Sequence, residues 1–324
     1  MLYLVLAILC SVTIGVLFKY TGQQGIDRVA LLTINYVAAV GVGVVLFATG
    51  GSVVEGDVSL SAGMLGLSAF VGILLIAGFF LLSLATDLAG MSLALGVWRV
   101  SVVLPFLASW VIWAEPPSGW QGAGMALAAI AFFLIAQQSP SNAAREEETA
   151  SGPPTAPAEA DSDAVSAAPA PVETVAEEAP AVASFGVLLL LFLSSGAIDI
   201  SLKTFSETYN AAQGEQAFFL LLSFGMAGLV GLVPVLAKGL RHREWPTAAA
   251  YGWGTVLGVV NYGSLEFLLR ALGVFPGTVV FPVNHLAIVL LGAVVGVFIF
   301  GEYLSRINRW GIALATVALV FLMM

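Results

Sequence analysis

Charged residues are scarce in this chain. Asp, Glu, Lys and Arg make up 10% of its 324 residues, whereas 59% of the residues are hydrophobic. A soluble domain of this length cannot bury so much apolar surface, which excludes a water-soluble globular protein and makes lipid the expected solvent. The apolar runs are continuous, unlike the alternating segments of about ten residues in a membrane β-barrel. The composition therefore predicts an all-α polytopic membrane protein.

Cysteine and histidine are scarce as well. The single Cys10 excludes a disulfide framework and a cysteine metal cluster, and the chain has only two histidines. The sequence also lacks a P-loop, a dinucleotide-binding glycine fingerprint, an HExxH motif and a GxSxG motif. We therefore expect no enzymatic activity, no cofactor, no metal site and no nucleic-acid partner.

Ten stretches approach the length of about 20 mostly apolar residues that a membrane-spanning helix needs. They are roughly 2–19, 30–48, 62–85, 89–113, 120–136, 184–203, 216–236, 248–269, 274–299 and 309–323. The first stretch lacks the basic flank and the cleavage site of a secretory signal, so we expect it to be retained as a helix. Short connections at 86–88 and 272–273 predict antiparallel neighbours.

The two ends of the chain resemble each other. The segment 10–19 returns as 194–203 at an offset of 184, and 114–115 corresponds to 301–302 at an offset of 187. Each copy holds five expected spans, an odd number, so two joined copies must lie upside down to each other in the bilayer. This pattern is typical of inverted-repeat transporters. The predicted fold is thus ten transmembrane helices arranged as two inverted five-helix repeats.

The segment between the repeats has a different composition. It is rich in Ala, Pro and Glu, lacks aromatic residues, and contributes −8 to the net charge of −9. Such a composition is typical of a disordered, extended linker. The expected organisation is a first repeat over 1–137, a linker over 138–183 and a second repeat over 184–324. A docking or regulatory role of the linker is the alternative to a passive connection.

Ionisable side chains inside a bilayer cost about 2.5–3.5 kcal/mol on insertion scales, so each is a functional candidate. Arg99 lies near the middle of the fourth expected span and is expected to bind substrate or to form a structural ion pair. Asp199 precedes Lys203 by four residues on one helix face, so it is either an intrahelical partner or a proton-coupling site. Glu266 and Arg270 repeat this spacing and predict a structural ion pair.

Further polar and aromatic candidates lie at central positions. His285 aligns with Trp98 at the offset of 187. A histidine can carry a proton near physiological pH, although a lone histidine on an apolar helix is also typical of a hydrogen-bonded core. Asn35, Asn261 and Asn284 are weaker candidates, either for substrate binding or for holding helices together.

Prolines and glycines in two spans predict local irregularity. Pro105, Pro276 and Pro282 interrupt the fourth and ninth expected spans. A proline frees a carbonyl one turn back and allows a bend. Gly292 and Gly296 form a GxxxG pattern, which indicates a helix-packing face.

The duplicated segments share a spacing with known carriers. The residues at the first, fifth and ninth positions of this spacing are Ser11, Gly15 and Lys19 in the first half, and Ser195, Asp199 and Lys203 in the second. Together with the stretch 96–98 and the pairs 114–115 and 301–302, they resemble the drug/metabolite transporter superfamily. The resemblance is to ten-helix carriers with two EamA-type halves, each similar to a small multidrug resistance unit. In those units the first position is an essential Glu, so the serines here mean that their proton/drug exchange cannot be carried over intact.

The orientation in the membrane has two conflicting expectations. Loops that follow odd-numbered spans carry eight Lys and Arg residues against two in the even-numbered loops. This bias predicts that both termini lie outside the cell. The family resemblance implies that both termini lie in the cytoplasm.

The sequence and the resemblance together predict a multi-pass protein of the cell membrane, inner or plasma. We expect secondary active transport of a small metabolite by alternating access, with proton coupling as an option. The expected partners are a small-molecule substrate and the lipid bilayer, and the protein is expected to be a monomer or a homodimer. Trp98, Arg99 and His285 are the main substrate-binding candidates, and Asp199 is the proton-coupling candidate. The alternative is a non-transporting membrane sensor or assembly protein that uses the acidic linker for docking.

Overall fold

The computed structural model describes residues 1–49, 61–89, 91–136, 181–209, 213–301 and 304–324, and within these ranges it contains helices and no strand. The helices are α1 (Leu2–Gln23), α2 (Arg28–Ala48), α3 (Ala62–Ala89), α4 (Met91–Val100), α5 (Val103–Val111), α6 (Gly119–Ala136), α8 (Ala181–Thr208), α9 (Gln213–His242), α10 (Ala248–Leu272), α11 (Gly277–Phe300) and α12 (Arg306–Leu322). The expected linker 138–183 lies outside the described residues, except for its last three residues, which begin α8.

Among the described residues, seven helical segments are long and apolar enough to cross a membrane, judged by length and composition. They are Leu2–Gln23, Arg28–Ala48, Ala62–Thr86, Leu93–Val111, Phe185–Thr208, Glu215–His242 and Gly277–Phe300. Large apolar side chains cover much of the outer surface; Phe298 is 83% exposed and Trp310 73% exposed. An apolar exterior on long apolar helices is what a membrane-embedded polytopic protein requires.

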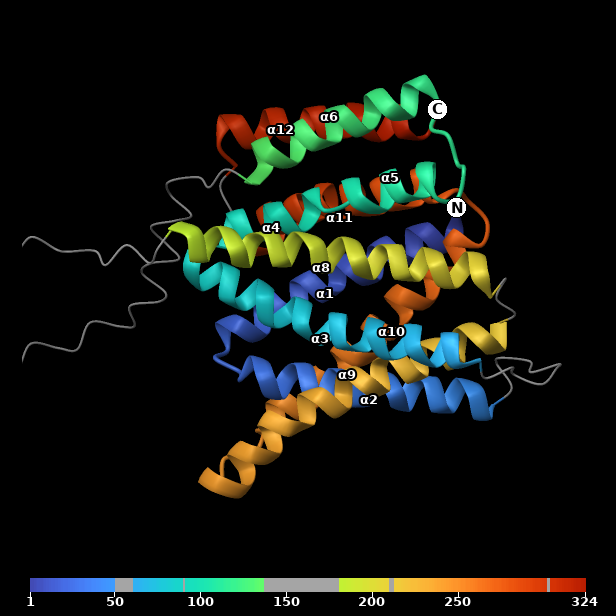
Figure 1. Ribbon diagram of the computed structural model, residues 1–324. Coiled ribbons are helices and arrows are strands. Elements are labelled where there is room, and N and C mark those ends of the chain that lie inside the picture. The colour runs from blue at the N-terminus through green and yellow to red at the C-terminus, as the bar shows by residue number, and fades with distance from the viewer. Residues whose placement is uncertain (50–60, 90, 137–180, 210–212, 302–303) are drawn as a thin grey trace, which may run out of the picture.

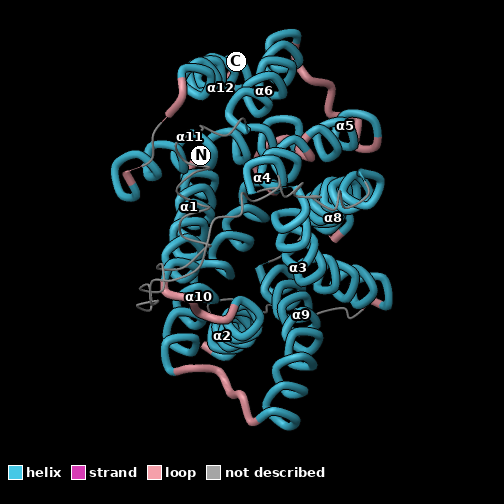
Figure 2. The backbone as a smooth tube through the Cα atoms, turned by 90° about the vertical axis from the view of Figure 1, so that its left-hand side faces the viewer, coloured by secondary structure: helices cyan, strands magenta, loops and turns pink. Residues whose placement is uncertain are grey.

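The helices form one bundle with their axes roughly aligned (Figure 1). Helices α6 and α12 pack together at one edge of the bundle, and α2 and α9 pack together at the opposite edge (Figures 1 and 2). Between them, α10 packs on α1 and α2, while α3 packs on α8 and α9. Helices from before and after the linker therefore alternate through the bundle, and the two termini lie at the same end of it (Figure 1).

Two glycines allow the closest approaches between these helices. A Cβ atom on Gly258 of α10 would collide with the Asn35 carbonyl and Ala38 of α2. A Cβ atom on Gly72 of α3 would likewise collide with the Ser223 carbonyl and Met226 of α9. Small residues at such positions let membrane helices gain close van der Waals contact where the hydrophobic effect gives little drive for association.

The fourth expected span is broken into α4 and α5, as its proline predicts. Pro105 has no N–H group to donate to the Ser101 carbonyl, and that carbonyl accepts from the Leu104 amide instead, at 2.9 Å. The helical ladder is thus interrupted at Ser101 and Val102. The expected connection at 86–88 was wrong, because α3 continues to Ala89 and the Thr86 hydroxyl bonds back to the Leu82 carbonyl.

Side-chain caps fix the start of two helices at one end of the bundle. The Asp27 carboxylate accepts from the amides of Val29 and Ala30 at the start of α2, and it also accepts from Lys238 at 2.9 Å. Burial alone would raise the pKa of Asp27, but these hydrogen bonds outweigh it and lower the pKa below its ordinary value. Thr247 caps α10 by accepting from the Ala250 amide.

Candidate functional site

Three ionisable residues from three helices converge within the bundle. The His285 Nε2 atom on α11 lies 3.1 Å from the Asp199 Oδ2 atom on α8. Both residues are buried. The Arg99 guanidinium on α4 is partly buried and interacts electrostatically with the Asp199 carboxylate. The structure therefore brings together three of the residues that the sequence selected, from segments on both sides of the linker.

The break between α4 and α5 attaches Trp98 and Arg99 to α8. The Ser101 and Ser195 hydroxyl oxygens lie 2.8 Å apart, and the Ser195 hydroxyl also donates to the Trp98 carbonyl at 3.4 Å. Close packing continues at the next residue of α8, because a Cβ atom on Gly196 would collide with Leu104. The break in the helical hydrogen bonding thus leaves the Ser101 hydroxyl and the Trp98 carbonyl to contact Ser195, and these contacts hold Arg99 near Asp199.

Aromatic contacts join α4 to α3 and α3 to α1. The Trp98 ring lies 5.8 Å from the Phe79 ring of α3, measured between centroids, and the Phe79 ring lies 5.2 Å from the Phe18 ring of α1. The other serine at the spacing shared with known carriers, Ser11 of α1, lies 2.7 Å from the Ser264 hydroxyl of α10. Both serines are thus engaged with a serine of another helix.

Two buried polar atoms on α11 remain available. The Nδ1 atom of His285 and the Oδ1 atom of Asn284 are buried and have no hydrogen-bond partner among the described residues. The amide oxygen is an acceptor, whereas the ring nitrogen accepts or donates according to the tautomer. A bound molecule that carries both donors and acceptors can satisfy both atoms.

The remaining amide candidates lie in a separate contact. The Asn261 Nδ2 atom of α10 donates to the Asn35 Oδ1 atom of α2 at 3.2 Å. No described hydrogen bond joins this pair to Asp199 or His285. The pair ties α2 to α10 beside the close approach at Gly258, so helix association is the role that its geometry gives it.

The charged pairs only partly follow sequence spacing. Glu266 and Arg270 form the expected i,i+4 ion pair at 2.6 Å, and the Arg270 guanidinium lies 5.6 Å from the centroid of the Tyr3 ring of α1. Lys203 does not pair with Asp199, the candidate four residues before it, although it does pair with Glu207, four residues after it. Its ammonium contacts Glu115 and Glu207, each at 2.6 Å, and Asp199 pairs with His285 instead.

Glu115 belongs to the pair 114–115 that carries the family resemblance, and its sequence position alone predicts no role for its side chain. Lys203, a lysine within an apolar span, indicated that such a carboxylate exists, because a buried ammonium needs a carboxylate partner. Sequence spacing could not supply that partner, because Glu115 lies 88 positions away.

A cavity of about 430 Å³ lies elsewhere, at the loops that join α1 to α2 and α9 to α10. Its lining includes Gln24, Asp27, Lys238, Trp245 and Thr247 but none of the candidate residues named above. This cavity opens between loops at one end of the bundle, away from the buried charged groups of α4, α8 and α11. No group of three or more His, Cys, Asp or Glu residues that could hold a metal ion occurs within the described ranges.

Comparisons with known proteins give a relative and a fold. No protein-family profile matches the chain. An uncharacterized protein of Haemophilus influenzae is 27% identical over 314 residues, covering 95% of this chain and 93% of that protein. A solved crystal structure of a protein matches with a TM-score of 0.64 and 14% identity, covering 99% of this chain and 94% of its own. That likeness shows a shared fold and nothing about function.

Proposed function

We propose that the protein is a secondary active transporter that moves a small metabolite across the cell membrane by alternating access. We further propose that it is a ten-helix carrier of the EamA type within the drug/metabolite transporter superfamily. The observation that carries the proposal is the convergence of Arg99, Asp199 and His285 from α4, α8 and α11 within an apolar bundle. Ionisable groups held inside such a bundle are typical of substrate and ion pathways.

The packing supports two inverted repeats. If α4 and α5 together count as one span, the described residues hold ten. Helices α1, α2, α3, α4–α5 and α6 then correspond in order to α8, α9, α10, α11 and α12. Exchanging the halves turns the contact of α1 with α10 into that of α8 with α3, and the contact of α2 with α10 into that of α9 with α3. The contacts of α2 with α9 and of α6 with α12 map onto themselves. Helices α1 and α8 also start at opposite ends of the bundle (Figure 1).

Equivalent residues support the same symmetry. Gly72 and Gly258 lie 186 positions apart and make the same kind of close contact with α9 and α2. Ala114 and Gly301, at an offset of 187, both adopt left-handed backbone conformations, with φ angles of 53° and 64°. Two unrelated bundles would have no reason to repeat such features at offsets that differ by only one residue.

The charges of the site favour a particular class of substrate. The Arg99 guanidinium can bind a carboxylate or phosphate of an anionic or zwitterionic metabolite. The Asp199–His285 pair can accept and release a proton, which would couple transport to the proton gradient. The unpartnered atoms of His285 and Asn284 add polar contacts for the remaining part of such a substrate.

The test begins with a ligand-dependent thermal-shift screen of purified protein against amino acids, sugars, nucleotides and lipophilic cations. Flux of the ligand found is then measured in proteoliposomes. Arg99→Ala is expected to remove both ligand stabilisation and flux while the protein still inserts. The matched control is Arg28→Ala, which removes an exposed arginine at the start of α2. Unchanged affinity and flux in Arg99→Ala would contradict the binding role.

A further inference from the structure

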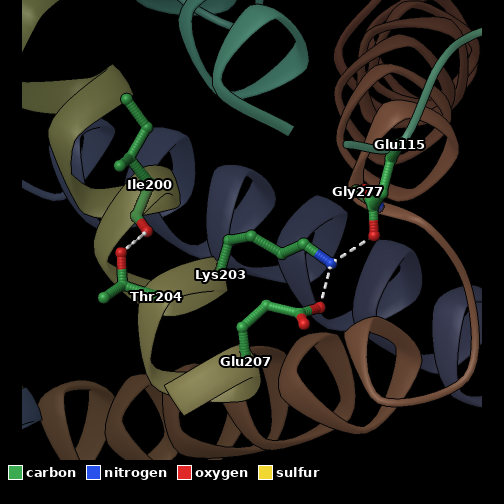
Figure 3. Close-up of polar contacts among 6 residues, drawn as sticks. All are labelled: Glu115, Ile200, Lys203, Thr204, Glu207 and Gly277. Carbon is green, nitrogen blue, oxygen red and sulfur yellow. Dashed lines mark hydrogen bonds and ion pairs between the residues drawn. The ribbon is translucent and has the colours of Figure 1, made fainter. Parts of the chain in front are cut away.

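Lys203 is the most deeply buried charged residue among those described. Its side chain is 1% exposed, and its ammonium lies 2.6 Å from a carboxylate oxygen of Glu115 and 2.6 Å from one of Glu207 (Figure 3). A buried ammonium is stable only when it is paired and hydrogen-bonded. The two carboxylates differ in origin, because Glu207 is one turn further along α8 whereas Glu115 comes from the loop between α5 and α6.

Glu115 joins three separate parts of the chain. One carboxylate oxygen, Oε1, binds Lys203 of α8, and the other, Oε2, accepts from the Gly277 amide at 2.7 Å (Figure 3). Gly277 is the first residue of α11, so its amide has no acceptor within the helix. A carboxylate at a helix N-terminus also interacts favourably with the helix dipole. Glu115 therefore holds the end of α8 to the start of α11.

The backbone around Glu115 is shaped for this contact. Ala114 has a φ of 53°, a left-handed conformation that alanine rarely adopts, and the Glu115 amide donates to the Ser109 carbonyl at 3.2 Å. Gly277 packs so tightly on Ser109 that a Cβ atom would collide with the serine hydroxyl. The turn thus brings the carboxylate directly to the α11 N-terminus.

The contact lies between the candidate site and one end of the bundle. The α5–α6 loop, the end of α8 and the start of α11 lie at the end that also carries both termini (Figure 1). Asp199 precedes Lys203 by one turn of α8, about 6 Å along the axis, and His285 follows Gly277 by eight residues, about 12 Å. A path from this end between α8 and α11 to the Asp199–His285 pair would lead past Glu115.

We propose that Glu115 is a gating residue, which closes the path to the site at this end by joining Lys203 to the α11 N-terminus. In the alternate state, α8 and α11 separate here, and Glu115 loses at least one of its two partners. This inference rests on the proposed transport by alternating access and adds the residue that controls one entrance. Its test therefore measures the separation of the helices directly and does not depend on flux.

The experiment places spin labels on the two helix ends. Thr208, at the end of α8, and Val274, just before α11, are exposed and are replaced by cysteine in a Cys10→Ser background. Label-to-label distances are measured by pulsed electron paramagnetic resonance in nanodiscs. Glu115→Gln keeps an acceptor for the Gly277 amide but loses the ionic bond to Lys203, so we expect the ratio of open to closed molecules to rise about tenfold.

Glu207→Gln is the matched control. It removes the same charge from the same ammonium, but Glu207 belongs to α8 and does not bridge to α11. The distance distribution of this variant is expected to match that of the parent. Equal shifts in both variants, or no shift in Glu115→Gln, would overturn the gating role. If Glu115→Gln does not fold, Glu115→Asp replaces it, because aspartate keeps the charge on a side chain one methylene shorter. A shift toward the open state in this variant but not in Glu207→Gln supports the gating role, and no shift or equal shifts overturn it.

Flux measurements separate this inference from the proposed function. A tenfold shift in Glu115→Gln in a protein that transports no tested solute would count against transport and leave the gating contact standing. Unchanged distances in a protein with normal flux would overturn the gating contact alone.

Discussion

Ala114 is one of two non-glycine residues with a positive φ among those described. Alanine in the left-handed region costs roughly 1–2 kcal/mol, because its Cβ atom approaches a carbonyl oxygen. Gly301, 187 positions later in the sequence, is a glycine with a similar φ. The turn that presents Glu115 is therefore maintained against a local backbone preference.

Replacing Ala114 with glycine should relieve this strain. We expect Ala114→Gly to stabilise the protein by about 1 kcal/mol, less than the full strain because glycine also gains freedom in the unfolded chain. Ala126→Gly, on an exposed face of α6, is the control and should destabilise by about 1 kcal/mol. Thermal or denaturant unfolding in detergent measures both, and a loss of stability in Ala114→Gly would contradict the strained turn.

Asp27 should make stability depend on pH. Its pKa is lowered in the folded protein, so its contribution is present above its ordinary value of 3.8 and is lost as pH falls through the lowered value. Asp27→Ala should cost about 1 kcal/mol at neutral pH, and this difference should shrink below about pH 4. Asp27→Asn keeps a cap that does not titrate, so its stability relative to Asp27→Ala should not change over this range. A pH-independent difference between wild type and Asp27→Ala would exclude the ionised cap.

At the residue scale, spacing predicted only contacts within one helix. Glu266 and Arg270 pair as their separation of four residues indicates. Asp199 and Lys203 have the same separation, yet each takes a partner from a distant segment, His285 and Glu115. Local periodicity gives the face of a helix but not the side chains that other helices bring to that face.

At the element scale, the interruption of the helix in the fourth expected span could be predicted, because proline lacks a backbone N–H donor. Pro105 lies just after the gap between α4 and α5, as the loss of an N–H donor predicts. The packing of glycines was less predictable. Of the GxxxG pattern that predicted a packing face, Gly296 is buried, but a Cβ atom on Gly292 would meet no atom of another helix within 4 Å. The closest backbone contacts are instead at Gly72 and Gly258, which a motif alone does not distinguish.

The close approach at Gly258 should be sensitive to a single methyl group. Gly258→Ala would push α10 from the Asn35 carbonyl of α2, and overpacking of this kind costs about 1–3 kcal/mol. Gly252→Ala, in the same helix, meets no atom within 4 Å and should be neutral or stabilising by up to about 1 kcal/mol. Unfolding measurements on the two variants compare them directly, and equal effects would contradict the proposed packing.

At the scale of the whole molecule, composition was sufficient to predict an all-helical membrane-embedded protein, because 59% hydrophobic residues allow few other solutions. The internal sequence repeat predicted an inverted arrangement of the two halves. We propose the same arrangement from the helix contacts, which map onto one another when the halves are exchanged. The relative placement of α4, α8 and α11 could not be predicted, since it depends on packing between segments more than 80 positions apart.

The linker provides a test of function at this scale. If the protein is a carrier whose site lies within the helices, deletion of residues 141–180 should leave flux and ligand affinity unchanged in proteoliposomes. A scrambled linker of the same length and charge is the control for spacing. Loss of activity in the deletion but not in the scrambled chain would show a need for length, whereas loss in both would favour a docking protein.

The placement of both chain ends on one side of the bundle has a practical consequence (Figure 1). A fluorescent protein that matures only in the cytoplasm can be fused in turn to Met1 and to Met324. Because both ends lie on one side, either both fusions fluoresce or neither does. Either result decides between the opposed orientations given by loop charge and by family likeness, without any knowledge of the solute carried.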